Sequence, residues 1–505
     1  MQTFLTRRGR TTAVAASAAA LLLTACSSGS TTADAPSPTP VVGLDAIYAQ
    51  DLDWTDCGDL ECADVVVPMD WNEPDGDTIT IAINRRAATG ERIGSLLVNP
   101  GGPGGSGVDF IADNLDYLGF GEQVMARYDL IGFDPRGVGQ SSAVDCLTDA
   151  ELDAEFAFTT TDDEAGYTES LARATTFSEA CLQNTGPLLE HVGTVQAARD
   201  LDVLRAVLGD DTLHYLGYSY GTFLGTTYAA LFPDMVGRMV LDGAVDPRTT
   251  PEENIKVQAA GFENALRAYV ADCLTGTDCP LTGTVDEALT QLSSLLDAVE
   301  AQPLPTEIDD RELTGSLAYT GIGAALYSEE SWPYLTMGLD SAITGGDGSV
   351  LLLLADMYYE RDSNTGEYLS NQMEANVAIN CADEGTRVMT YAEVEAQIVD
   401  IATVAPTMAE SFVGPSCVGW PVAAEGGLDD YSAAGSAPIL VVGTTNDPAT
   451  PYSWSQGLTE TLDSATLLTF QGEGHTAYGR SNSCILDAVD AYLIDGTVPA
   501  EGTTC

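Results

Sequence analysis

Basic residues are scarce in this sequence of 505 residues. It contains 19 lysines and arginines, with Lys256 as the single lysine, against 76 aspartates and glutamates, so the formal net charge is −57. So acidic a surface repels phosphate groups, which argues against binding to nucleic acid and against electrostatic attachment to anionic lipid headgroups. The excess of carboxylates fits two explanations, an adaptation to high salt and a feature that keeps the protein soluble.

Histidine is scarcer still. The chain has only His191, His214 and His475, and no Cys-x-x-Cys repeat accompanies them. Structural zinc sites are built from these two residue types at short spacing. We therefore expect no metal site, and the sequence indicates no other cofactor.

The chain also lacks the run of ~20 apolar residues that a membrane-spanning helix needs. Near its start, Arg7, Arg8 and Arg10 are followed by a short apolar stretch at 13–23 and by Leu23-Thr24-Ala25-Cys26. This order is typical of a cleaved export signal, with a twin-arginine signal at Arg7-Arg8 as the alternative. The last four residues resemble the lipobox of bacterial lipoproteins. The resemblance implies a lipid on Cys26 that anchors the protein to the outer face of a bacterial cell membrane.

Eleven cysteines are present, and removing Cys26 leaves ten, which is an even number. An exported protein meets an oxidising compartment, where disulfides are favoured over free thiols. We therefore expect five disulfides, namely Cys57–Cys62, Cys146–Cys181, Cys273–Cys279, Cys381–Cys417 and Cys484–Cys505.

Short β-branched runs alternate with longer amphipathic stretches along much of the chain. This alternation predicts an α/β fold in which a mostly parallel sheet is flanked by helices. Strands are expected at Val65–Val67, Thr78–Asn84, Ser95–Asn99, Tyr128–Asp134, Leu213–Gly217, Arg238–Leu241, Ile439–Gly443 and Ala465–Phe470. The first two are expected to pair as an antiparallel hairpin.

The strand pattern disappears for almost 200 residues between Leu241 and Ile439. Helices are indicated there instead, for example at Thr284–Glu300, Gly321–Ser328 and Tyr391–Ile401. A crossover between parallel strands needs only a dozen or so residues, so this stretch predicts an inserted helical lid. The expected order is an export signal at 1–26, a flexible tether at 27–45, the core at 46–246 and 431–505, and the lid at 247–430.

Gly217-Tyr218-Ser219-Tyr220-Gly221 is the one G-x-S-x-G sequence in the chain. It follows a predicted strand and precedes a helix-like run, as in the strand-turn-helix that exposes a nucleophilic serine. The flanking glycines are needed because side chains would clash in so sharp a turn. The pattern indicates Ser219 as a nucleophile, and a tight structural turn is the alternative.

The matching base and acid follow from position. His214 lies in the strand that leads to the nucleophile, and His191 precedes the nucleophile, whereas His475 follows the last strand in a Gly-Glu-Gly-His-Thr loop. Asp447 is the carboxylate in the loop after the preceding strand. The resulting order of serine, aspartate and histidine is that of α/β-hydrolases. In such a triad the carboxylate fixes the imidazole tautomer and stabilises the imidazolium. The alternative for His475 is a surface loop histidine.

The glycine-rich run Asn99-Pro100-Gly101-Gly102-Pro103-Gly104-Gly105-Ser106-Gly107 follows the third predicted strand. Its backbone amides can approach a substrate without interference from side chains. We expect the amides of Gly102 and Tyr220 to form the oxyanion hole. A phosphate-binding loop is the rival interpretation, but the run lacks the G-K-[ST] ending and the Rossmann spacing.

These motifs carry a family resemblance. The glycine-rich loop, Gly132-Phe133-Asp134-Pro135-Arg136-Gly137, the serine turn and Leu241-Asp242-Gly243 resemble the exported actinobacterial tripeptidyl aminopeptidases, which are α/β-hydrolases related to proline iminopeptidases. Asp447-Pro448-Ala449-Thr450-Pro451, the C-terminal region and Ala378-Ile379-Asn380-Cys381-Ala382-Asp383 are similar to the same family. Proline iminopeptidases usually have a histidine before the Gly-Gly-Pro-Gly loop, whereas this chain has Asn99-Pro100, which argues against strict proline specificity.

The resemblance implies a serine exopeptidase that removes short, tripeptide-like peptides from N-termini. Such an enzyme needs a carboxylate for the substrate's α-amine, and Asp383, which matches the family's motif, is the favoured candidate together with Glu384. The alternative for both is an exposed acid in a very acidic protein. A carboxylesterase with the same triad is the closest rival function, and a non-catalytic extracytoplasmic binding lipoprotein is the second. The expected partners are peptides with a free N-terminus and, through the lipid alone, the membrane.

Overall fold

The computed structural model describes residues 43–114, 119–415 and 417–505, which belong to one compact unit. The predicted export signal, Cys26 and almost all of the tether lie outside these described residues. None of the described helices has the length and the apolar character needed to cross a membrane.

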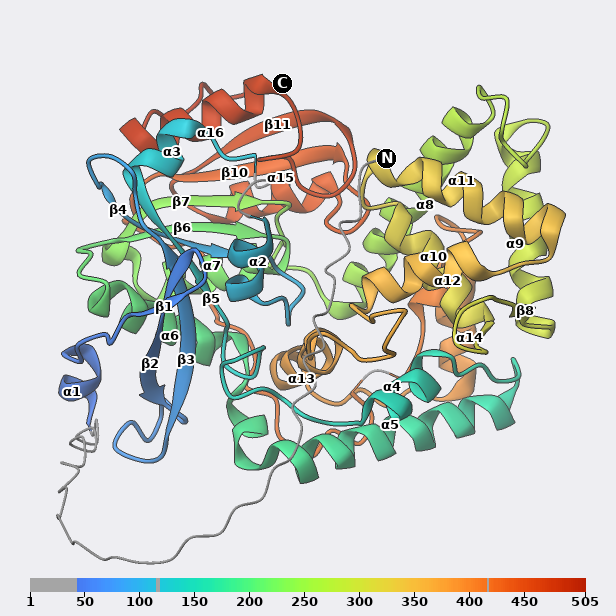
Figure 1. The fold of residues 1–505 in the computed structure, drawn as a ribbon, viewed down its shortest axis with the longest axis horizontal. Coiled ribbons are helices and arrows are strands. Elements are labelled where there is room, and N and C mark those ends of the chain that lie inside the picture. The colour runs from blue at the N-terminus through green and yellow to red at the C-terminus, as the bar shows by residue number, and fades with distance from the viewer. Residues whose placement is uncertain (1–42, 115–118, 416) are drawn as a thin grey trace, which may run out of the picture. The chain divides into compact units, whose positions relative to one another are not determined.

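A nine-stranded sheet forms the centre of the core, in the order β1-β2-β3-β5-β4-β6-β7-β10-β11 (Figure 1). The pairs among β1, β2, β3 and β5 are antiparallel, and the remaining pairs are parallel. The strands are β1 (Thr55–Cys57), β2 (Leu60–Pro68), β3 (Thr78–Arg86), β4 (Gly94–Asn99), β5 (Tyr128–Phe133), β6 (Leu213–Tyr218), β7 (Val236–Asp242), β10 (Ile439–Asn446) and β11 (Ala465–Glu473). The eight predicted strands and the antiparallel hairpin of β2 and β3 are confirmed, and β1 is an addition.

Helices cover both faces of this sheet. The helices of the core are α1 (Leu44–Tyr48), α2 (Gly107–Asn114), α3 (Glu122–Arg127), η1 (Gly186–His191), α6 (Thr194–Val207), α7 (Tyr220–Leu231), η2 (Pro233–Met235), α15 (Tyr452–Thr461) and α16 (Ser483–Asp495). Successive side chains of a strand point to opposite faces, so Leu97 packs with α6 and α7, whereas Leu96 and Val98 pack with α3 and α16. Because both faces are covered, β4 and β5 are buried along their whole length.

The segment between β7 and β10 forms the helical insertion, which has a hydrophobic core of its own. Its elements are α8 (Pro251–Cys273), α9 (Val285–Ala301), β8 (Leu304–Pro305), β9 (Glu312–Leu313), α10 (Gly315–Ala325), η3 (Glu329–Ser331), α11 (Trp332–Asp340), η4 (Ser341–Gly345), α12 (Ser349–Tyr358), α13 (Gln372–Glu384), α14 (Tyr391–Ile401) and η5 (Ala409–Phe412). The helices expected at Thr284–Glu300 and Tyr391–Ile401 are confirmed. The short antiparallel pair of β8 and β9 was not predicted, because no strands were expected in this segment.

The helix expected at Gly321–Ser328 was placed wrongly, because α10 begins at Gly315 and ends at Ala325. The hydroxyl of Thr314 caps its start by accepting the amide hydrogen of Leu317. Gly321 does not mark a helix start. It lies inside α10, where a Cβ atom would overlap the carbonyl oxygen of Leu351 in α12, so it serves the close packing of these two helices.

At the border between core and insertion, some helices pack against the part of the fold to which they do not belong by chain order. Helices α4 (Asp149–Phe156) and α5 (Glu164–Thr185) lie between β5 and β6 in the chain. Nevertheless, Phe156 packs against the hydrophobic core of the insertion, and Asp153 pairs with Arg361 at 2.7 Å. Conversely, α13 belongs to the insertion by sequence but packs through Ala378 and Ile379 into the core of the sheet. Figure 1 shows α13 between the sheet and the other helices of the insertion.

The ten cysteines outside the predicted export signal form five disulfides, in the same pairs as expected from the sequence. They are Cys57–Cys62, Cys146–Cys181, Cys273–Cys279, Cys381–Cys417 and Cys484–Cys505. The bridge from Cys381 to Cys417 joins α13 to the segment after η5. The bridge from Cys484 to Cys505 holds the C-terminus beside β11, where Cys505 donates its amide hydrogen to Thr469.

Candidate active site

Ser219 is the single residue between β6 and α7, in a sharp turn. Its backbone has φ 54° and ψ −125°, a combination that residues with side chains seldom adopt. The turn is tight because a Cβ atom at Gly217 would overlap the carbonyl oxygen of Gly221, and one at Gly221 would lie 2.6 Å from Asn99 Oδ1. The two glycines of the G-x-S-x-G sequence are therefore required by the packing, and the serine side chain faces the cavity described below.

His475 and Asp447 lie in the loops after β11 and β10. The Nδ1 atom of His475 donates to both carboxylate oxygens of Asp447, at 2.8 and 3.0 Å. The buried carboxylate also accepts the amide hydrogens of Ala449, Thr450 and Thr476 at 2.9–3.0 Å, so its position is fixed. A carboxylate held in this way leaves Nε2 of the imidazole as the proton acceptor.

The end of β7 connects the serine turn to the histidine loop. The amide of Ser219 donates to the carbonyl oxygen of Asp242 at 2.9 Å. The next residue, Gly243, contacts the histidine, since a Cβ atom there would lie 3.3 Å from Cε1 of His475. The carboxylate of Asp242 accepts the amide hydrogens of Ala477 and Tyr478, and burial raises its pKa to about 6. Thus one residue holds both loops.

The other two histidines are engaged elsewhere. His214 lies in β6 and accepts the amide hydrogen of Arg238 through Nδ1, and burial lowers its pKa to about 4. His191 ends η1, where its Nδ1 lies 3.9 Å from Asp70. Neither borders the cavity that contains Ser219.

Two neighbours of the histidine were not predicted from the sequence. The hydroxyl of Thr450 donates to Asp447 at 3.1 Å and lies 3.3 Å from Nδ1 of His475. The sequence contains a sign of this contact, because Thr450 is a hydroxyl residue three positions after Asp447. Tyr327, from the insertion, accepts the amide hydrogen of His475 and sets its ring edge-on to the imidazole, with 5.4 Å between ring centres. No local pattern marks this residue.

The glycine-rich loop lies directly against the serine turn. A Cβ atom at Gly101 would be 2.8 Å from Cβ of Ser219 and 3.2 Å from the amide nitrogen of Tyr220. Gly102 and Tyr220 both border the cavity beside Ser219. Within the described residues, neither of their amides donates a hydrogen bond. Two free amides beside a serine hydroxyl are the arrangement that stabilises a developing oxyanion.

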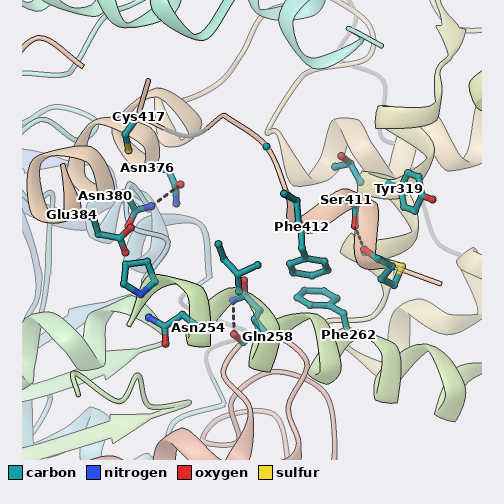
Figure 2. Close-up of a pocket in the computed structure, with 18 of the residues that line it drawn as sticks. Asn254, Gln258, Phe262, Tyr319, Asn376, Asn380, Glu384, Ser411, Phe412 and Cys417 are labelled. Carbon is teal, nitrogen blue, oxygen red and sulfur yellow. Dashed lines mark hydrogen bonds between the residues drawn. The ribbon is translucent and has the colours of Figure 1, made fainter. Parts of the chain in front are cut away.

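The serine opens into a cavity of about 1900 Å³ between the core and the insertion. Figure 2 shows two groups of side chains around it. Asn376, Asn380 and Glu384 of α13 lie on one side, and Phe262 and Phe412 lie on the other. The cavity therefore has a polar half and an aromatic half, and the insertion supplies most of both.

The two candidate amine ligands differ in environment. Asp383 is half-buried, accepts the amide and hydroxyl hydrogens of Thr194 at 2.7 and 2.5 Å, and has its pKa raised to about 7, mainly by desolvation. The same hydroxyl lies 2.6 Å from that of Tyr220. Glu384 is exposed to solvent and borders the cavity, desolvation raises its pKa, and no ion pair or hydrogen bond engages its carboxylate in the described part of the chain.

Comparison with known proteins agrees with this geometry. Residues 402–505 match the family model of the TAP-like proteins. The tripeptidyl aminopeptidase of Streptomyces lividans is 32% identical, over 90% of this chain and 86% of its own. The serine protease Hip1 of Mycobacterium tuberculosis is 41% identical, over 90% of this chain and 91% of its own. The chain belongs to the tripeptidyl aminopeptidase family of α/β-hydrolases.

Members of this family are not all described as peptidases. Carboxylesterase B of Mycobacterium tuberculosis is 39% identical, over 91% of each chain. What these relatives share is hydrolysis, and the two mycobacterial proteins carry the names of a protease and an esterase. This member of the tripeptidyl aminopeptidase family is accordingly a serine hydrolase, and a non-catalytic binding protein is disfavoured.

Proposed function

We propose that this serine hydrolase is an exopeptidase that removes short, tripeptide-like peptides from free N-termini through an acyl-enzyme on Ser219. The observation that carries the proposal is the carboxylate of Glu384, which has no partner among the described residues and borders the same cavity as Ser219. A protonated α-amine entering this cavity needs a negative partner to replace water. Glu384 and its neighbour Asp383, which borders the same cavity, supply that charge.

The proposed reaction uses the triad in two halves. Nε2 of His475 takes the proton of the Ser219 hydroxyl while the oxygen attacks the scissile carbonyl carbon. The amides of Gly102 and Tyr220 stabilise the oxyanion of the tetrahedral intermediate. The carbon–nitrogen bond then breaks as His475 gives its proton to the leaving amine. Water, activated by the same histidine, hydrolyses the acyl-enzyme and releases the short peptide.

A chain of side-chain amides links the proposed amine site to the oxyanion loop. Asn380 donates to Asn376 at 3.1 Å, and Asn376 donates to the carbonyl oxygen of Pro103 at 3.0 Å. Pro103 follows Gly102 directly, and Glu384 lies one helical turn after Asn380 on α13. These contacts support a fixed distance between the proposed amine site and the carbonyl that would react. A fixed distance is what an exopeptidase needs to count residues from the N-terminus.

Export and a lipid anchor on Cys26 form part of the proposal. They are supported by the resemblance of Leu23-Thr24-Ala25-Cys26 to a lipobox, and this segment lies outside the described residues. The five disulfides suit a protein that folds in an oxidising compartment.

The second candidate function is that of a carboxylesterase with the same triad. It is favoured by the 39% identity to carboxylesterase B over 91% of this chain. An ester substrate carries no obligatory α-amine, so Glu384 and Asp383 would have no part in its recognition. The two functions therefore differ in what these carboxylates do.

Blocking the amine separates the two candidates. We expect wild type to cleave peptides with a free N-terminus far faster than their acetylated forms. Glu384→Gln should lower kcat/KM for the free peptides by about 10- to 100-fold, the range for a lost charge-assisted contact, and leave the acetylated forms unchanged. Product formation is measured by chromatography and mass spectrometry.

The matched control is Glu395→Gln, which removes the same charge from α14, outside the cavity lining. It should leave both substrates unaffected. Equal turnover of free and acetylated peptides, or rapid hydrolysis of simple esters with no peptidase activity, would favour the esterase.

A further inference from the structure

Aromatic rings form a continuous row that begins at the histidine. Tyr327 stands edge-on to His475, Phe262 is edge-on to Tyr327 with 5.7 Å between ring centres, and Phe412 lies 5.5 Å from Phe262. The three aromatic side chains border the cavity that contains Ser219. Figure 2 shows Phe262 and Phe412 next to each other on the side away from Asn376, Asn380 and Glu384.

The chemistry of acyl transfer indicates which part of a substrate lies on the aromatic side of the cavity. The base hands its proton to the leaving group, so the leaving group must sit beside the histidine, and the acyl carbonyl oxygen faces the oxyanion amides. In this chain the polar half adjoins the oxyanion loop through Asn376 and Pro103. The aromatic half adjoins His475 through Tyr327. The N-terminal residues of a substrate therefore occupy the polar half, and the residue after the cleaved bond enters the aromatic half.

We propose that Tyr327, Phe262 and Phe412 form a subsite for an apolar, and best an aromatic, side chain on the residue that follows the cleaved bond. The proposal rests on the exopeptidase function proposed above. It adds a preference on the leaving side, which that function does not require.

The walls of this subsite come from three separate segments of the insertion, namely α8, η5 and the turn after α10 that contains Tyr327. Phe262 lies in α8 and is only 7% exposed, packed into the hydrophobic core of the insertion, so its ring is held firmly. Phe412 ends η5 and is half-buried, with one side against Phe262 and another toward the cavity. Aromatic rings favour offset and edge-on contacts with other rings, so this wall suits an aromatic side chain.

Charge at the outer end of the aromatic half adds discrimination. Glu410 borders the cavity two residues before Phe412, and Asp162, Asp297 and Glu300 border it as well. Asp162 and Asp297 add to burial in raising the pKa of Glu410, which places these carboxylates near one another. An acidic side chain on the leaving residue would meet this negative field, so the subsite should reject aspartate as well as favour phenylalanine.

The test varies only the leaving residue. The cleaved bond is first mapped by mass spectrometry in a parent peptide, and the residue after that bond is then Phe, Leu, Ser or Asp, with the acyl side constant. We expect wild type to cleave the Phe peptide at least about tenfold faster in kcat/KM than the Ser peptide, and the Asp peptide slowest. Phe412→Ala should reduce the Phe-to-Ser ratio below about threefold and leave kcat/KM for the Ser peptide near that of wild type.

Two further variants make the result interpretable. Phe177→Ala removes an equally half-buried ring from α5, outside the cavity lining, and should keep the wild-type ratio. Phe412→Leu keeps an apolar wall and should retain most of the preference for Leu. An equal rate for Phe and Ser peptides in wild type, or an unchanged ratio in Phe412→Ala, overturns the subsite.

An ester series distinguishes failure of the subsite from failure of the exopeptidase function. If no peptide is cleaved, benzyl and methyl esters of one acyl group replace the peptides, since the alcohol then occupies the leaving side. A preference for the benzyl ester that Phe412→Ala abolishes would retain the subsite while the exopeptidase function falls. No preference between the esters would overturn both.

Discussion

Two features of the candidate site lower the stability of the folded state, namely the strained backbone of Ser219 and the buried carboxylate of Asp447. A serine at φ 54° persists only where its surroundings hold it, and here Asp242 anchors its amide and Thr222 anchors its carbonyl. Asp447 is buried and accepts hydrogen bonds from several donors, one of which is the ring of His475. In the proposed mechanism, residues held in this way need little reorganisation to reach the transition state.

At this scale the first prediction concerns the triad. Ser219→Ala and His475→Ala should each lower kcat by roughly 10⁴-fold or more, because the nucleophile and its base act as one unit. For the same reason the double variant should be scarcely slower than either single variant. Steady-state kinetics, with circular dichroism to verify folding, make the comparison. His191→Ala is the control and should remain active. If activity survives in His475→Ala, the base is a different residue.

A second prediction at the residue scale follows from the pKa of Asp383. Burial raises this pKa to about 7, so the carboxylate form accumulates only as the pH rises through that value. The α-amine of a peptide loses its proton above about pH 8. The ratio of kcat/KM for free over acetylated peptides should therefore rise from pH 6 to about 7 and decline above about 8. Taking the ratio cancels the titration of the triad, which both substrates share.

Asp383→Asn tests the origin of the rise. This variant has no carboxylate to titrate, so its ratio should lack the rise near pH 7 and keep the decline above about 8. A rise of unchanged position in Asp383→Asn would assign the titration to another group, with Glu384 next in line because burial also raises its pKa.

At the scale of elements, the strands of the parallel sheet were predictable because burial on both faces leaves a continuous apolar run. β4 and β5 are examples, and each lies within one residue of its predicted bounds. β1, β8 and β9 were not predictable, since two or three residues are too few to show any periodicity. The start of α10 was predicted six residues too late, at Gly321, which lies inside the helix and packs closely against α12.

The candidate site also contains residues that were predictable from the sequence and residues that were not. Ser219, Asp447 and His475 follow the ends of parallel strands, which meet at one edge of a sheet, so chain order alone predicts their meeting. Tyr327 and Asn376 reach the site from the insertion, and their contacts depend on how α10 and α13 pack against the core. No local pattern in the sequence encodes such packing. The division of the cavity into a polar half and an aromatic half could therefore be found only from the structure.

One disulfide connects those two halves. Cys381 lies in α13 between Asn380 and the carboxylates of the polar half, and Cys417 lies five residues after Phe412. Both cysteines are buried in the hydrophobic cluster of the sheet. The bridge therefore ties α13, which carries the proposed amine site, to the segment that follows Phe412. This arrangement suits an enzyme that must place both ends of a cleaved bond.

At the scale of the whole molecule, acidic residues far outnumber basic ones. Most of the few basic side chains are already committed to ion pairs, for example Arg136 with Asp200, Arg311 with Asp356 and Lys256 with Asp400. With 76 acidic residues in the chain, most carboxylates have no such partner. Their mutual repulsion acts against the compact state. The carboxylates around Glu410 are a local example, because Asp162 and Asp297 contribute to its raised pKa.

The balance between this repulsion and the ion pairs gives the last prediction. Salt weakens both, but the acidic residues outnumber the basic ones by 76 to 19, so relief of repulsion should outweigh the loss of pairs. The screening length falls from about 30 Å at 0.01 M to about 10 Å at 0.1 M ionic strength. We therefore expect Tm to rise by roughly 5 °C between 0.01 and 0.3 M NaCl and to level off above that range. Sodium sulfate at equal ionic strength should give the same rise, since screening depends on ionic strength, whereas exclusion of sulfate from the surface would add a further, linear gain at high concentration. A Tm that is flat or falls over the low-salt range would mean that the ion pairs dominate and that the acidic surface does not oppose folding.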